Sequence, residues 1–110
     1  MQRIVTLTER KTAEAERRRL GVEALLPVLA DYARAHGGRF LLFGSAARGQ
    51  MKYHSDVDLL MDFPEEALNE VWTFAEEACW DLGLEPDLLP YGGCRPNFLD
   101  HIAADTKVLG

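Results

Sequence analysis

A turn of small residues and a pair of aspartates lie close together near the middle of the chain. The turn, residues 44–49, reads Gly-Ser-Ala-Ala-Arg-Gly, and Asp56 and Asp58 follow it. Glycine allows backbone conformations closed to other residues, and a helix start attracts phosphate. Two carboxylates at alternate strand positions share a face about 6.6 Å apart at Cα, which suits Mg²⁺. The pattern therefore predicts a site for a triphosphate and a divalent metal, as nucleotidyl transfer requires.

Three residues of the turn are candidate phosphate ligands. Gly44 supplies the tight bend, and Ser45 offers a hydroxyl and a backbone N–H where a brief helix should begin. Arg48 adds positive charge, and a phosphate contact and a surface or partner contact are equally compatible with its position.

A third carboxylate is expected from a later strand. Asp87 lies in the segment Glu-Pro-Asp-Leu-Leu, and it would face Asp56 and Asp58 if that strand pairs beside theirs. It could then bind metal, accept a proton from an attacking hydroxyl, or do both. Glu85 would point to the same side and is the alternative, with Asp87 favoured.

The hydrophobic periodicity, with glycines and prolines at the ends of segments, predicts an α/β protein in which helices and strands alternate and the helices pack against a small sheet. On the strand predicted over 56–62, Val57, Leu59 and Met61 should face the core, opposite the aspartates. The final residues are expected to form a short extended tail. Helices are predicted over 11–20, from Val22 to about 36, over 65–82 and over 98–103; strands are predicted over 40–43, 56–62 and 84–89.

The first predicted helix is charged and begins at a capping box, Thr6 to Glu9. Glu14 is spaced to pair with Arg10 and with Arg18, which is typical of a solvated helix face. Pro27 is expected to kink the next helix or to mark its restart, because proline lacks the backbone donor.

Size and charge narrow the function classes. The 110 residues suffice for one domain, and no apolar run is long enough to span a bilayer. The start of the chain lacks a signal-peptide pattern, so we expect a cytoplasmic protein. A net charge of −6 argues against a standing affinity for nucleic acid. Cys79 and Cys94 do not indicate a disulfide framework.

Taken together, Gly44-Ser45, Arg48, Asp56-x-Asp58 and the later Asp87 resemble the DNA polymerase beta–like nucleotidyltransferase superfamily, and the short length resembles its minimal (MNT) branch. The resemblance implies a small mixed sheet flanked by helices. It implies that Gly44 and Ser45 contact the triphosphate and that the three aspartates hold Mg²⁺, with two ions expected. It also divides the chain into a charged helical arm, 1–22, and a catalytic domain, 23–110.

The same branch is similar to the antitoxin of HEPN/MNT toxin–antitoxin pairs. That resemblance implies transfer of AMP from ATP to a tyrosine of a HEPN-type toxin (AMPylation), and it makes the toxin a partner. Two alternatives stay open: an antitoxin that acts by binding alone, and a transferase acting on a small-molecule hydroxyl such as that of an aminoglycoside. A second copy of the chain could also complete the acceptor surface.

Overall fold

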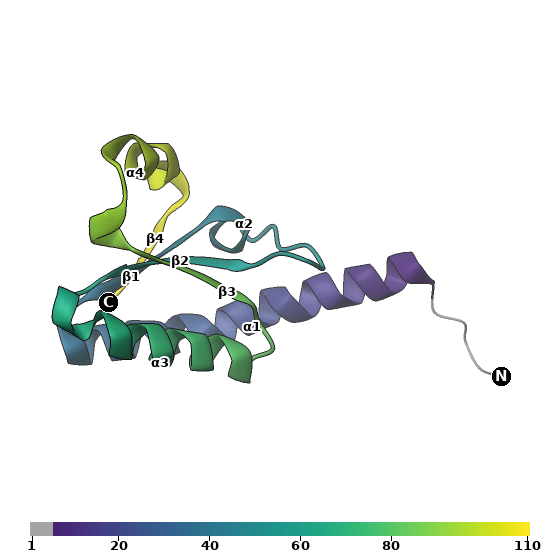
Figure 1. Ribbon diagram of the computed structural model, residues 1–110. Coiled ribbons are helices and arrows are strands. Elements are labelled where there is room, and N and C mark those ends of the chain that lie inside the picture. Colours follow the sequence, from purple (N-terminus) through teal and green to yellow (C-terminus); the bar gives the residue numbers. More distant parts are fainter. Residues whose placement is uncertain (1–5) are drawn as a thin grey trace.

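The part of the chain that the computed structural model describes, residues 6–110, contains one sheet of four strands in the order β3-β2-β1-β4 (Figure 1). β1 (Arg39–Phe43) runs antiparallel to β2 (Val57–Asp62). β3 (Pro86–Pro90) runs parallel to β2, and β4 (Lys107–Leu109) runs antiparallel to β1. The predicted mixed sheet flanked by helices is confirmed.

Two helices cover one face of this sheet. α1 (Leu7–His36) and α3 (Leu68–Asp81) lie side by side beneath it in Figure 1, and a short 3-10 turn, η1 (Glu65–Ala67), leads into α3. Their apolar stripes meet the strand residues that were expected to face inward. The core between them includes Leu25, Leu29, Ala33, Phe40, Leu42, Val57, Leu59, Met61, Val71, Ala75 and Cys79.

Shorter elements lie over the opposite face: α4 (Pro96–Ile102), η2 (Tyr91–Gly93) and η3 (Ala103–Asp105). α2 (Gly44–Ala47) lies at the end of β1, and its Ala46 and Ala47 are buried in the main core. Sequence alternation predicted that only one face of β2 is buried, and this was wrong. Leu60, on the face of Asp58, is fully buried, because the segment around α4 folds back over the middle of the sheet.

The N-terminal half of the chain forms one helix rather than the two that were predicted. α1 runs for 30 residues through Pro27, and it ends at Gly37, whose φ of 70° gives the left-handed cap. Thr6 caps its start by accepting a hydrogen bond from the Glu9 N–H, as the capping box predicted. Pro27 is tolerated because it and Glu23, whose carbonyl loses a donor, are both exposed to water.

Strand boundaries also differ from the predictions. Asp56 precedes β2 instead of beginning it, since pairing with the neighbouring strands starts at Val57. The third strand is shifted to Pro86–Pro90, and its prolines are accommodated because β3 is an edge strand. The predicted extended tail forms β4, which pairs with β1.

The first five residues of the predicted N-terminal arm lie outside the described part of the chain. Among residues 6–110, no helix has the length and apolar character needed to cross a membrane. Cys79 is buried and Cys94 half-buried, and both are free thiols.

Replacing Pro27 by Ala should stabilise the protein by about 1–2 kcal/mol, because alanine restores the missing helix hydrogen bond and has the higher helix propensity. The gain is reduced because proline also restricts the unfolded chain. Thermal unfolding measures it, with Val28→Ala, an exposed neighbour, as control. A Pro27→Ala melting temperature at or below that of the wild type would contradict a continuous α1.

Candidate active site

The pairing of β2 with β3 places two of the predicted acidic residues beside each other. In the parallel register Asp58 is opposite Asp87, between the apolar pairs Val57 with Pro86 and Leu59 with Leu88. Val57 and Leu59 are fully buried, and a one-residue slip would turn them to the other face. The apolar positions therefore fix the register, and the register brings the two carboxylates together.

The Asp58 carboxyl has a strongly perturbed acidity. Partial burial raises its pKa to about 6, and the neighbouring Asp87 carboxylate adds to this by repulsion and by a hydrogen bond. Asp56 raises the pKa further, while the positive charge of Arg48 opposes the shift. The site therefore concentrates negative charge that a bound cation would neutralise.

Asp56 lies farther from this pair. It is exposed, in the loop just before β2, yet its charge still acts on Asp58. Within residues 6–110, no three Asp, Glu, His or Cys side chains gather closely enough to hold a metal ion unaided. An arrangement of this kind fits Mg²⁺, which commonly binds one or two carboxylates and takes its other ligands from water and substrate phosphates.

Gly44 lies directly beside the acidic pair. Its φ is 71°, in the left-handed region, and a Cβ at this position would collide with the Asp58 carboxylate oxygen Oδ2. Both facts require glycine. The bend leads from β1 into α2, whose first backbone N–H groups have no partner within the helix. Oxygen acceptors of a ligand placed there would therefore lie next to the Asp58 carboxylate.

The other two candidates of the turn differ in their surroundings. Ser45 is half-buried, and its hydroxyl makes a long contact, 3.8 Å, to the Met51 sulfur. Arg48 is exposed and donates from Nε to Gln50 at 3.1 Å, with Asp105 at 3.8 Å from Nη1. Arg48 thus contacts Gln50 and Asp105 at the surface, and its positive charge also acts on Asp58.

Two further acidic residues near the pair, Asp62 and Glu85, differ from it in their surroundings. Asp62 shares the face of Asp58, but it forms an ion pair with Arg39 at 2.6 Å. Glu85 is exposed and precedes β3, and its carbonyl accepts the Val57 N–H. Asp87 is the residue in register with Asp58, so the geometry favours it over Glu85 as the third carboxylate.

A residue that the sequence did not single out holds the Asp56 loop in place. Arg18 of α1 is only 15% exposed and donates from Nη1 to the Ser55 carbonyl at 2.7 Å. Glu14 accepts from Arg18 at 3.0 Å, as its spacing predicted, and also from Arg17 at 2.9 Å.

Arg17 in turn donates to the carbonyls of Leu82 and Gly83, where α3 ends. Most of the charge run is exposed, as predicted for a solvated face, but Glu14 and Arg18 are half-buried, and Arg17 and Arg18 also contact other segments. Glu14 and the two arginines attach α1 to the loops on either side of the site. Helical spacing alone does not distinguish these contacts from exposure.

The comparison with protein families agrees with this geometry. A family model described as a nucleotidyltransferase domain matches residues 22–108. The chain belongs to this family. No curated protein matches the sequence. The matched region of this nucleotidyltransferase domain contains the Gly44 turn and all three aspartates, whose individual roles remain predictions.

Asp58→Asn should stabilise the metal-free domain at neutral pH. The folded state raises the Asp58 pKa from 3.8 to about 6, so it binds the proton more tightly than the unfolded chain. This carboxyl therefore lowers stability as the pH rises from about 4 through 6, and the loss is complete above that range. Asparagine carries no charge and so removes this loss of stability. The expected gain is only roughly 1 kcal/mol, because solvent reaches the Asp58 side chain and screens the neighbouring charges.

Chemical unfolding in EDTA between pH 4 and pH 8 tests this. The gain from Asp58→Asn should shrink towards pH 4, and Asp81→Asn on the exposed end of α3 should show no such trend. A gain that is independent of pH would show that charge repulsion at Asp58 is not its source.

Arg18→Ala should weaken binding of the nucleotide substrate about fivefold, because the Ser55 carbonyl loses its charged donor and the Asp56 loop gains freedom. Arg19→Ala is the matched control, since within the described part of the chain Arg19 pairs only with Glu16 and Glu23 of its own helix. Calorimetric titration well below both melting temperatures separates the effect from stability. Equal affinities in the two variants would rule out a positioning role for Arg18.

Proposed function

We propose that this nucleotidyltransferase domain transfers AMP from ATP to a hydroxyl group, with a tyrosine of a HEPN-type toxin as the acceptor, and so acts in the cytoplasm as an antitoxin. The observation that carries the chemistry is the Asp58–Asp87 pair beside the Gly44 bend. The acceptor and the antitoxin role are supported by the resemblance of the motifs to the MNT branch.

In this proposal Asp56, Asp58 and Asp87 would hold two Mg²⁺ ions together with phosphate oxygens. The fit rests on the donor set of hard carboxylate oxygens, in which burial of Asp58, together with the repulsion by Asp87, raises the Asp58 pKa. The ions would supply neutralisation of the phosphate charge and orientation of the attacking and leaving oxygens.

The residues of the chain perform the remaining tasks. Gly44 and Ser45 present backbone N–H groups and a hydroxyl to the β- and γ-phosphates, and Arg48 adds a positive charge. The acceptor oxygen forms a bond to the α-phosphorus as the bond to the bridging oxygen breaks, and pyrophosphate leaves with that electron pair. Asp87 accepts the proton of the attacking hydroxyl. Positioning and electrostatics suffice for such a transfer, so no covalent enzyme intermediate is needed.

An exposed part of the sheet next to the acidic pair offers a route for the acceptor. Leu89 follows Asp87 by two residues on the edge strand β3, so both side chains share a face, and Leu89 is 41% exposed. A protein side chain approaching over this edge would reach the carboxylates without displacing a helix. An apolar contact at the entrance favours a protein acceptor over a strongly polar sugar.

The test uses ATP labelled at the α-phosphate, the purified domain and, as the expected toxin, the product of the adjacent reading frame. Label should pass to the toxin with the wild type and with Asp81→Asn, whereas Asp56→Asn combined with Asp58→Asn should lose at least a hundredfold in rate, because the metal ligands are removed. Mass spectrometry should place AMP on a tyrosine.

Neutralisation of the toxin by the double variant, undiminished, would contradict the enzyme and favour an antitoxin that acts by binding alone. Label on an aminoglycoside but not on the toxin would contradict the protein acceptor. Absence of transfer to either would reject the proposal as a whole.

A further inference from the structure

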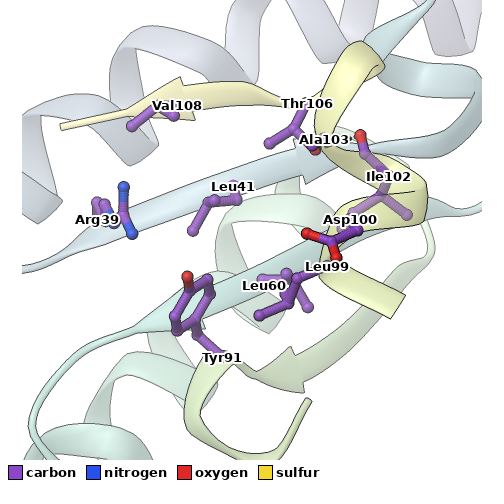
Figure 2. Close-up of a pocket in the computed structure, with 10 residues that line it drawn as sticks. All are labelled: Arg39, Leu41, Leu60, Tyr91, Leu99, Asp100, Ile102, Ala103, Thr106 and Val108. Carbon is purple, nitrogen blue, oxygen red and sulfur yellow. Dashed lines mark hydrogen bonds between the residues drawn. The ribbon is translucent and has the colours of Figure 1, made fainter. Parts of the chain in front are cut away.

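A pocket of about 340 Å³ lies on the same face of the sheet as Asp58, between the strands and α4 (Figure 2). Its floor is apolar, formed by Leu41 of β1 and Leu60 of β2, which are buried. Tyr91 and Asp100 stand on opposite sides of this floor in Figure 2. Its volume and its mixture of apolar walls and few polar groups are typical of small-molecule sites.

The pocket continues the line of the active site along the strands. Phe43, which precedes the Gly44 bend, is in register with Asp58, and Leu41 is in register with Leu60. The pocket floor is therefore one side-chain step, about 6.6 Å, from the carboxylates, on the side away from the bend. A ligand lying over this face passes from the phosphate turn to the carboxylates and then into the pocket.

The charged side chains that line the pocket indicate which end of a nucleotide it would bind. Arg39, at its far end, is neutralised by Asp62 and lies over the Tyr91 ring, 5.3 Å from its centroid. The Asp100 side chain has no hydrogen-bond or ion-pair partner among residues 6–110. The cation that lines the pocket is thus already paired and offers no free positive charge to phosphate, whereas the pocket presents an aromatic surface and a carboxylate that can accept a hydrogen bond.

We propose that this pocket binds the base of the nucleoside triphosphate, with an exocyclic amino group of the base donating to Asp100 and the ring held between the apolar floor and Tyr91. The inference rests on the proposed function, because it requires the α-phosphate to lie at Asp58 and Asp87. The ribose then spans the step from Asp58 to Leu60. Bases that carry an amino group, such as adenine, should be preferred to uracil.

A bulky side chain in the pocket tests the location. Ala103 lines the pocket, and Ala104, its exposed neighbour in η3, does not. Ala103→Trp should weaken Mg²⁺-ATP binding to the full chain at least tenfold and leave binding of Mg²⁺-tripolyphosphate, which has no base, unchanged. Ala104→Trp should change neither. Equal loss of both ligands in Ala103→Trp, or no loss of ATP, would overturn the assignment.

Asp100→Asn tests the recognition of the amino group. The wild type should bind ATP more tightly than UTP, and the variant should lose about tenfold for ATP and little for UTP, because a charged acceptor is lost. An unchanged ATP-to-UTP ratio would contradict the role of Asp100. Failure of the wild type to bind either ATP or tripolyphosphate would contradict the proposed function and this inference together, whereas ATP binding that Ala103→Trp does not alter would contradict this inference alone.

Discussion

The repulsion between Asp58 and Asp87 is the constraint around which this small domain is organised. Two carboxylates in register on adjacent parallel strands, one of them half-buried, lower the stability of the fold. The apolar residues on either side of the pair offset this loss of stability, since Val57, Leu59 and Leu88 are buried and can reach the core only in this register. Binding of cations and phosphate would turn the same repulsion into affinity, because the charges that oppose folding are the charges that a metal requires.

The two faces of the sheet have different roles. One face packs against α1 and α3 and provides most of the core. The other has the acidic pair at one end, the α4 segment over its middle and an exposed edge at β3. Ligands can approach this second face without opening the core, so a domain of this size can be stable and still present reactive groups.

α1 contributes more than a packing surface. Its first half extends beyond the sheet in Figure 1, and the Glu14 network there reaches the loop before Asp56 and the turn after α3. Charged side chains that hydrogen-bond to backbone carbonyls restrict loops more strongly than neutral ones do. The long helix thus contacts both segments that lead into the strands of Asp58 and Asp87. Because α1 continues unbroken through Pro27, the same helix also packs against the core.

Local sequence determined much of this protein. The capping box at Thr6, the end of α1 at Gly37, the buried strand after it and the glycine-serine bend all depend on residues that are near one another in the chain. Other features required the tertiary structure. The burial of Leu60, the edge position that admits Pro86 and Pro90, and the contact of Arg18 with Ser55 are made by partners distant in sequence. Periodicity shows which face of a segment is apolar, but only packing decides what covers the other face, and so the carboxylates could be named from the sequence whereas the pocket beside them could not.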